Sequence, residues 1–198
     1  MPTDSPVKRR RRDAVLEQAI LGQAWAELLD HGYAGLTLAR VAERSGTSRT
    51  VLARRWSGKA DLAVAAVRHE LDQRPFDAPD LGGVRVELLD YLQRISELAD
   101  VIGLIFSMLL DASFRETYAS PQDLRDALMR GRQDAFAIIV ERAIRRGELE
   151  QARLTQAVMA LLNDLLGNYV LLHRAAPPQG LCIAWVDEVF LPLVRKSE

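Results

Sequence analysis

The sequence predicts an all-α protein of about nine helices, with a three-helix N-terminal domain followed by a larger helical domain. Apolar residues recur every three or four positions along nearly all of the 198 residues, which is the period of an amphipathic helix. No run combines alternating apolar and polar residues with many β-branched ones, as a half-buried strand would. Because 48% of the residues are hydrophobic, the chain can bury a sizeable core, which excludes disorder over most of its length.

Four helices are expected within the first 74 residues. The first covers residues 13–31 and ends at Gly32, and its inward face carries an apolar residue every four positions: Leu16, Ile20, Ala24 and Leu28. The next two helices are short, can be capped by Thr37 and Ser48, and turn inward the side chains of Leu38, Val41, Ala42, Leu52 and Trp56. The fourth helix runs from Lys59 to Arg74.

Residues 75–83 contain two prolines and two glycines, and they form the clearest boundary in the chain. Pro121 suits the first position of a later helix, and Gly147 suits the end of one. Five helices are expected after the boundary, over residues 84–100, 101–117, 121–146, 154–174 and 181–194. Pro192 should end or kink the last of them near Leu191.

The net charge of −1 conceals an asymmetry between the two parts of the chain. Residues 1–74 hold 13 Lys and Arg against 9 Asp and Glu, a net charge of +4, whereas residues 75–198 carry a net charge of −5. A basic N-terminal third is typical of a surface that contacts nucleic acid. An ordinary solvated surface with a chance cluster of arginines is the alternative.

The two short helices have the parts of a DNA-reading helix-turn-helix. They meet at a tight turn that contains Gly46, and the small side chain of Ala42 lets them approach closely. Arginine can bind guanine through two hydrogen bonds or hold a phosphate. The second helix should expose such groups, namely Arg49, Thr50, Arg54 and Arg55. A plain helical hairpin with a basic face is the alternative interpretation.

The context of this segment resembles a known family. The run that includes Ile20, Gly32-Tyr33, Thr37, Val41-Ala42, Gly46, Ser48, Leu52, Trp56, Lys59 and Leu62 closely resembles the N-terminal domain of the TetR family of transcriptional regulators, without a gap over residues 13–67. The stretch RAIRRGEL at 142–149 resembles one variety of TetR-type regulatory domain. The resemblance implies a repressor that binds a palindromic double-stranded DNA operator as a homodimer and is released by a small molecule.

The resemblance also implies a domain layout and a set of DNA contacts. Residues 13–58 would read DNA, 59–74 would form a connecting helix, and 75–198 would bind ligand and dimerise. Thr37 would bind a backbone phosphate, Lys59 would clamp another, and the residues that would approach base edges are Ser48, Arg49 and Thr50.

The sequence departs from the family pattern at two positions of the second short helix. The family usually places tyrosine where this chain has Ala53, and often threonine where it has Val51. Two common DNA contacts are therefore missing, and Arg54 and Arg55 are the candidates to supply phosphate contacts instead. Residues 1–12 form a basic arm, expected to be flexible, that either enters a minor groove or remains a solvated tail.

The two helices expected at 154–174 and 181–194 are apolar nearly all round. A helix at the end of a small domain needs only one apolar face, so the excess must be covered. A symmetric homodimer with a four-helix interface would cover it. A pair of helices buried within a larger monomer is the alternative.

A ligand pocket is expected among the central helices, between residues 101 and 173. Its candidate walls are Phe106, Met108 and Phe136, and its candidate polar groups are Asp111, Asn163 and Tyr169. Asp111 in an otherwise apolar run suggests a ligand with a positive charge. The aromatic and methionine residues could equally be core, and Asp111 could cap a helix or pair with Arg115.

Other function classes find no support in the residues. His31, His69 and His173 form no pair with metal-ligand spacing, and the glycine-rich and nucleophile motifs of common enzymes are missing, so we expect neither an enzyme nor a cofactor or metal. The single Cys182, the lack of an apolar segment after the basic N-terminus and the short apolar runs predict a cytoplasmic protein outside the membrane. An architectural or non-specific DNA-binding protein is the second hypothesis, and a helical enzyme without a recognisable motif is the third.

Overall fold

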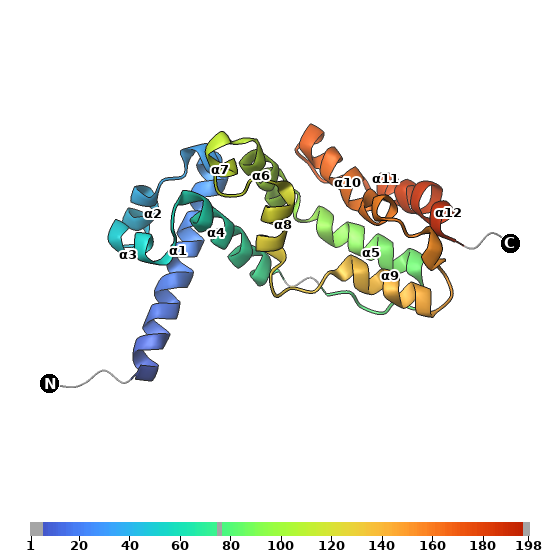
Figure 1. The fold of residues 1–198 in the computed structure, drawn as a ribbon, viewed down its shortest axis with the longest axis horizontal. Coiled ribbons are helices and arrows are strands. Elements are labelled where there is room, and N and C mark those ends of the chain that lie inside the picture. Colours follow the sequence, from blue (N-terminus) through green and yellow to red (C-terminus); the bar gives the residue numbers. More distant parts are fainter. Residues whose placement is uncertain (1–5, 75–76, 196–198) are drawn as a thin grey trace. The chain divides into compact units, whose positions relative to one another are not determined.

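The computed structural model describes residues 6–74 and 77–195, and the side chains from residue 13 onward. Every regular element in these residues is helical (Figure 1). The chain forms two compact units, each with its own core: residues 1–75 with 104–130, and residues 76–103 with 131–198. In the described part of the chain, no helix is long and apolar enough to cross a membrane.

The first unit is built on a long helix, α1 (Pro6–Gly35), whose helical geometry is interrupted at Gly32. Beside it lie α2 (Leu38–Arg44), α3 (Arg49–Arg55) and α4 (Lys59–Gln73), as Figure 1 shows. The segment 104–130 adds the end of α6 (Ala99–Leu110), α7 (Ala112–Arg115) and α8 (Pro121–Met129). The largest buried side chains of this unit include Ile20, Leu28, Leu36, Leu52, Leu62, Met108, Phe114 and Leu124.

The second unit begins with α5 (Val84–Ser96) and the start of α6. It continues with α9 (Ala135–Arg145), a 3-10 turn (Gln151–Arg153) and α10 (Gln156–His173). It ends in an unbroken helical run made of α11 (Gln179–Ala184), a π-helical turn (Trp185–Phe190) and α12 (Leu191–Val194). Its core includes Leu88, Leu92, Phe136, Ile139, Leu162, Leu166, Val186 and Phe190.

The predicted caps of the two short helices are confirmed. The Thr37 hydroxyl accepts a hydrogen bond from the Arg40 amide at 3.3 Å, and Ser48 accepts one from the Val51 amide, also at 3.3 Å. Gly46 lies in the turn between them with a φ of 64°, a left-handed conformation that glycine adopts without steric cost. The amide of the next residue, Thr47, then reaches the Ala42 carbonyl at 2.9 Å and closes the turn.

Three predicted helix boundaries were wrong. The helix expected at 101–117 is divided at Asp111. The Asp111 carboxylate accepts hydrogen bonds from the amides of Ser113 and Phe114 and so caps the start of α7. The helix expected at 121–146 is divided at Gly131, which has a φ of 79°, and Asp134 caps the second part. The break expected at residue 100 occurs earlier, between α5 and α6.

Pro192 was expected to end or kink the last helix near Leu191, and the helix does not end there. The helical run widens into a π-turn over Trp185–Phe190 and then continues to Val194. In a π-turn the backbone hydrogen bonds join residues five apart instead of four, and such turns are a common place for a helix to bend. If the run from Gln179 to Val194 is taken as one helix, the described residues contain eleven helices and a 3-10 turn, close to the nine expected.

The residues of α7 and α8 pack with the N-terminal helices, although a single boundary was expected at residue 75. Phe114 is fully buried between two rings, with centroids 5.0 Å from Tyr33 and 5.1 Å from Tyr118. The Tyr118 hydroxyl donates a hydrogen bond to Asp61 on α4 at 3.1 Å. Aromatic packing and this hydrogen bond therefore make the segment 104–130 part of the first unit.

Candidate nucleic-acid interface

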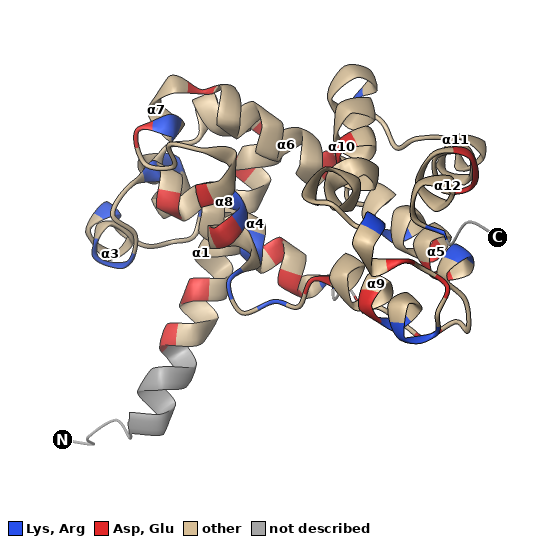
Figure 2. Ribbon diagram, turned by 45° about the vertical axis from the view of Figure 1, so that its right-hand side comes forward, with Lys and Arg blue, Asp and Glu red and all other residues tan. Residues whose placement is uncertain are grey.

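Helix α3 is held by its apolar side and presents its polar side to solvent. Leu52 is its one fully buried residue among those described. The side chains at the start of the helix are exposed: Ser48, Arg49 and Thr50. Ala53 and Arg54 are exposed one turn later. Figure 2 shows basic residues on α3, and the exposed Arg49 and Arg54 add hydrogen-bond donors and positive charge to its solvent-facing surface.

Helix α2 is fixed to α1 by a buried carboxylate. The Glu27 side chain is 3% exposed, and it receives a hydrogen bond from Arg44 at 2.7 Å. Arg40 lies 3.5 Å from the same carboxylate, and His31 lies 3.8 Å away. The Arg44 hydrogen bond lowers the pKa of Glu27, although burial opposes this effect, and the charges of His31, Arg44 and Arg40 add to it. This ion cluster positions Thr37, the cap of α2.

Lys59 opens α4 and is half-buried. Its ammonium group donates a hydrogen bond to the Ala34 carbonyl at 3.2 Å and lies 4.2 Å from the centre of the Tyr33 ring. A lysine ammonium has three protons, so two remain for other acceptors. Lys59 thus joins α4 to the end of α1 and keeps donors available for a phosphate.

Arg55 differs from the other arginine at the end of α3. Its side chain is 19% exposed and forms a hydrogen bond to Glu17 on α1 at 2.8 Å, with Asp13 3.7 Å away. Arg54, by contrast, is exposed, and it has no hydrogen bond or ion pair with any described residue. Of the two arginines expected to bind phosphate, one is therefore already occupied by carboxylates of its own chain.

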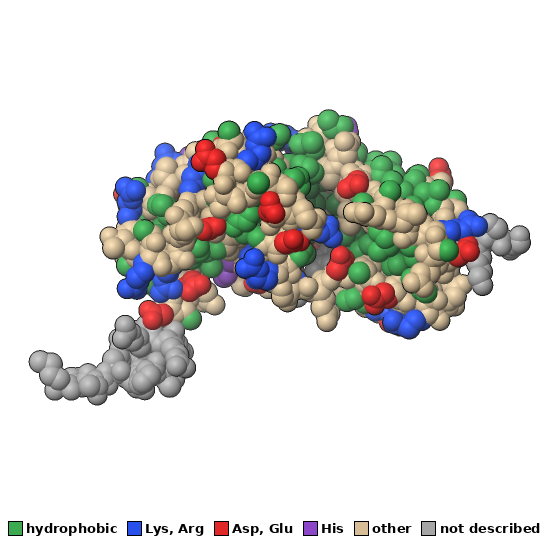
Figure 3. Space-filling model, in the orientation of Figure 1, with side chains coloured by type: hydrophobic (Ala, Val, Ile, Leu, Met, Phe, Trp, Pro, Cys, Tyr) green, Lys and Arg blue, Asp and Glu red, His purple; other side chains and the backbone are tan. Residues whose placement is uncertain are grey.

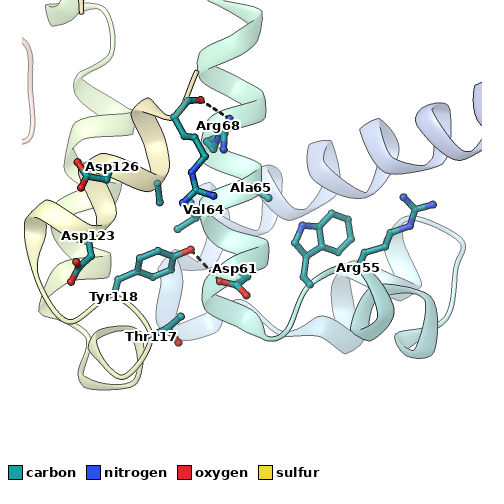
Figure 4. A pocket seen from close by; sticks show the side chains of 12 residues that line it. Arg55, Asp61, Val64, Ala65, Arg68, Thr117, Tyr118, Asp123 and Asp126 are labelled. Atoms are coloured by element: carbon teal, nitrogen blue, oxygen red, sulfur yellow. Dashed lines mark hydrogen bonds between the residues drawn. The ribbon is translucent and has the colours of Figure 1, made fainter. Parts of the chain in front are cut away.

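An open cleft of about 630 Å³ lies within the first unit, beside the end of α3. It is lined by residues of α3, α4, α8 and the loop before α8: Arg55, Trp56, Asp61, Val64, Ala65, Arg68, Thr117, Tyr118, Asp123, Asp126, Ala127 and Arg130. Figure 4 shows the Tyr118 hydroxyl directed at Asp61. Burial raises the pKa of Tyr118 to about 12, and the hydrogen bond to Asp61 acts in the same direction. The phenol is therefore neutral and serves as a donor.

The six candidate ligand residues divide between the two units. Phe106, Met108 and Asp111 lie in the first unit, where Met108 is fully buried and Asp111 caps α7. Phe136, Asn163 and Tyr169 lie in the second unit. The Phe136 ring is buried, and Asn163 accepts a hydrogen bond from Tyr91 at 2.6 Å. The Tyr169 ring stacks on His173 with the centroids 4.2 Å apart.

Helices α10, α11 and α12 leave apolar side chains uncovered. Hydrophobic side chains lie at the surface over α10 and α11 in Figure 3. The large exposed ones are Leu171 and Leu172 on α10, Val189 on the π-turn and Leu193 on α12, with exposed fractions from 37% to 69%. Other apolar side chains of these helices pack into the core of the second unit, among them Leu162, Leu166, Trp185, Val186 and Phe190.

Sequence reasoning did not single out Glu27, Tyr33 or Asp61 as organising residues. A signal for Glu27 was present, because it lies seven residues after Ile20 and three after Ala24, on the buried face of α1. A charged residue on such a face requires a partner of opposite charge. The partner could not be read from the periodicity, since Arg44 is 17 residues away in the chain. The first helix was expected to begin at residue 13, after a flexible basic arm at 1–12, but α1 begins at Pro6. The side chains of the arm lie outside those described, so its contact with DNA stays a prediction.

Comparisons with known proteins agree with this geometry. Residues 20–66 match the model of bacterial regulatory proteins of the tetR family, and residues 78–189 match a tetracyclin repressor-like C-terminal domain. An uncharacterised HTH-type transcriptional regulator of Mycobacterium bovis, Mb1581, is 28% identical over 182 residues, which cover 91% of this chain and 89% of that protein. A DNA-binding transcriptional repressor of Mycobacteroides abscessus, TetR, is 27% identical over 186 residues, which cover 89% of this chain and 93% of that protein.

Solved structures share the fold at low sequence identity. A TetR-family regulator from Mesorhizobium loti superposes with a TM-score of 0.62 at 16% identity, over 93% of this chain and 99% of that one. The flavonoid-responsive regulator FrrA gives a TM-score of 0.59 at 14% identity, over 93% of this chain and all of that one. Since the two family models together match most of the sequence and the helix-turn-helix has the geometry described above, the chain belongs to the TetR family of DNA-binding transcriptional regulators.

Proposed function

We propose that this regulator is a homodimeric repressor that binds a near-palindromic operator through α3 and leaves it when a small molecule binds. The observation that carries the proposal is the exposed polar side of α3, with Arg49, Thr50 and Arg54 free of described partners while Leu52 anchors the helix. A helix held in this way can enter a major groove without rearranging its own contacts.

The proposed contacts follow from the donors that remain available. Thr37 and Ser48 each accept a backbone amide as a helix cap, which leaves the hydroxyl proton to donate to DNA. We assign Thr37, Lys59 and Arg54 to phosphates, and Ser48, Arg49 and Thr50 to base edges. Val51 is half-buried and Ala53 has only a methyl group, so base reading depends on the start of the helix.

Dimerisation through α10 and the run α11–α12 is supported by their exposed apolar side chains. Leu171, Leu172, Val189 and Leu193 would lose this exposure in a two-fold interface of four helices. A dimer would also supply the second reading helix that a palindrome requires, about 34 to 36 Å from the first.

Repression and release by a ligand are supported by the names of two similar proteins and by one feature of the second unit. One relative is named a repressor and one fold neighbour is named flavonoid-responsive. In this chain, Tyr91 of the apolar core forms a hydrogen bond with Asn163, and the half-buried Tyr169 packs against the same core. An apolar site with a few polar groups is typical of a ligand pocket. We therefore assign the ligand to the region of Phe136, Asn163 and Tyr169.

The DNA part is tested by selection from a random duplex library followed by footprinting and sedimentation. We expect a near-palindromic site protected on both halves by a dimer. Protection of a single half-site by a monomer would overturn the proposal. Equal affinity for selected and random DNA at every salt concentration would favour the architectural hypothesis instead.

The ligand part is tested by a thermal-shift screen and then by calorimetry with and without the selected DNA. A ligand that releases DNA must bind more weakly to the DNA complex, and by the same factor by which it weakens DNA binding, about 1 to 3 kcal/mol in typical cases. A compound that binds the free protein and the complex equally well is no inducer.

A further inference from the structure

Arg55 is the last residue of α3, and its guanidinium group faces α1. One terminal nitrogen donates to Glu17 at 2.8 Å, and the other lies 3.7 Å from Asp13. Glu17 and Asp13 are four residues apart on α1, so both carboxylates lie on the same side of that helix. Figure 4 shows the side chain directed away from Tyr118, toward α1.

The surroundings of Arg55 disfavour a DNA phosphate. One guanidinium and two carboxylates give a local formal charge of −1, which repels an anion. The Nε atom is buried and has no hydrogen-bond partner, so it is not available to an acceptor in solvent. Arg54, one residue earlier, is exposed and has no carboxylate bound to it among the described residues.

Arg44 at the end of α2 shows the same arrangement with a more buried carboxylate partner. It donates to Glu27 at 2.7 Å and to Gln23 at 3.0 Å, and both acceptors are on α1. The two helices of the reading motif thus each end in an arginine that is bound to α1. For α2, two buried apolar residues, Val41 and Ala42, also fix the helix, whereas α3 has only Leu52.

We propose that Arg55 is a positioning residue, which sets the orientation of the recognition helix on α1 and makes no DNA contact itself. A seven-residue helix with one buried anchor can rotate about that anchor. Arg55 lies three residues after Leu52, and its bond to Glu17 supplies the second fixed point. The side chains at 48–50 are then held in one direction relative to α1, which supports selective reading of bases. The inference rests on the reading role proposed for α3.

The first test compares Arg55→Ala, Glu17→Ala and Arg54→Ala on a duplex that the wild-type protein selects from a random library, and on random DNA. Loss of this ion pair should lower the ratio of selected to random affinity by about twofold to fivefold in both the Arg55 and Glu17 variants, as expected for a pair whose carboxylate is half exposed. The dependence of affinity on salt should not change its slope. Arg54→Ala, the matched control, should lower the salt slope by about one.

Charge exchange separates positioning from direct contact. The double variant Glu17→Arg with Arg55→Glu should recover most of the lost selectivity, because the pair is restored in reverse while position 55 is now acidic. If Glu17→Ala behaves like the wild type while Arg55→Ala lowers the salt slope by about one, Arg55 contacts a phosphate and the proposal is wrong. Failure of the exchange to recover selectivity also overturns it.

A measurement without DNA keeps the inference testable if the wild type selects no sequence, an outcome that would count against the proposed function. Amide hydrogen exchange of the free protein should be faster in α3 than in the wild type for both Arg55→Ala and Glu17→Ala, and unchanged in α4. The exchanged pair should restore slow exchange. Unchanged exchange in α3 in both single variants would overturn the proposal, whatever the DNA result. The Arg55→Gln variant, which removes the charge but keeps a long side chain, provides the same comparison if Arg55→Ala does not fold.

Discussion

At the scale of single residues, several polar side chains combine a structural bond with donors left for DNA. Thr37 and Ser48 cap their helices through the hydroxyl oxygen and keep the hydroxyl proton. Lys59 uses one donor on the Ala34 carbonyl and rests on the Tyr33 ring. Such bonds fix each group before DNA arrives, which reduces the conformational entropy lost on binding.

Arg49 is predicted to read one base position. It begins α3, is exposed and has no described partner, so its guanidinium can form two hydrogen bonds to a guanine. Arg49→Ala should cost about 1 to 3 kcal/mol of binding free energy and relax preference at that position. Titrations against single-base variants of the selected duplex measure both effects. A uniform loss on all variants would assign Arg49 to a phosphate.

At the scale of elements, α1 is the support on which the reading helices are mounted. It contributes Glu27 to α2, Glu17 to α3 and the Ala34 carbonyl to α4. The Glu27 carboxylate is 3% exposed, so removing its arginine partner would leave a buried charge uncompensated, whereas the Glu17 carboxylate is 49% exposed. The orientation of α2 and α3 therefore depends on acidic residues of α1 that are not among the proposed DNA contacts.

Glu27 is predicted to make the stability of the first unit depend on acid pH. The hydrogen bond from Arg44 lowers its pKa in the folded chain, whereas the unfolded carboxyl titrates near about 4.3. The unfolded state therefore binds more protons in this window, and stability falls as the pH drops through the folded pKa. The difference in unfolding free energy between the wild type and Glu27→Gln should be constant above about pH 5 and should shrink below it.

Urea denaturation at several pH values measures this difference. Glu43→Gln is a suitable control, since Glu43 is on α2 and exposed. A Glu27→Gln difference that stays constant down to pH 3 would show that the carboxylate contributes nothing through its charge.

The segment that enters α5 is held by a second buried carboxylate, Glu87, whose side chain is 0% exposed. Arg146 lies 2.8 Å and Arg142 3.3 Å from it, and the Leu81 amide donates to it at 3.1 Å. Arg142 also donates to the carbonyls of residues 78 and 79 at 2.8 Å. Arg142 and Arg146 of the RAIRRGEL stretch therefore hold the segment 78–84 and the start of α5 against α9.

Glu87→Ala is predicted to destabilise the second unit strongly. Two arginines would lose their buried partner, which typically costs about 3 to 5 kcal/mol. Chemical denaturation measures the loss, and Glu141→Ala, an exposed position on α9, should change stability little. A cost below about 1 kcal/mol would show that the arginines find other partners.

At the scale of the whole molecule, the apolar side chains of α10 to α12 are predicted to mediate self-association. Leu172 is 69% exposed, so Leu172→Glu should not disturb the core, but it would place a charge in the proposed interface. Sedimentation at micromolar concentration should change from twice 22.1 kDa to 22.1 kDa, and affinity for the selected duplex should fall. Leu110→Glu, at a leucine 75% exposed on α6, is the control. A Leu172→Glu variant that remains dimeric would exclude α10 from the interface.

The sequence alone determined the helical class, the reading motif and the caps that define it. These features are local: the apolar period of α1 and α4, the hydroxyls of Thr37 and Ser48, and the turn at Gly46 depend on residues within a few positions of each other. The resemblance to a family pattern over residues 13–67 followed from the same local signals, and the family model matches residues 20–66.

Only the tertiary structure decided which polar side chains form bonds within the protein and which remain available to other molecules. Arg54 and Arg55 are adjacent and identical in type, yet one is exposed and the other is bound to Glu17, 38 residues earlier. Asp111, a ligand candidate by composition, is a helix cap, and the segment 104–130 packs with the N-terminal unit through Phe114. Periodicity reports which side of a helix is apolar, but it carries no information on which distant helix meets that side. The partner of each charge was therefore fixed by packing between elements remote in the chain.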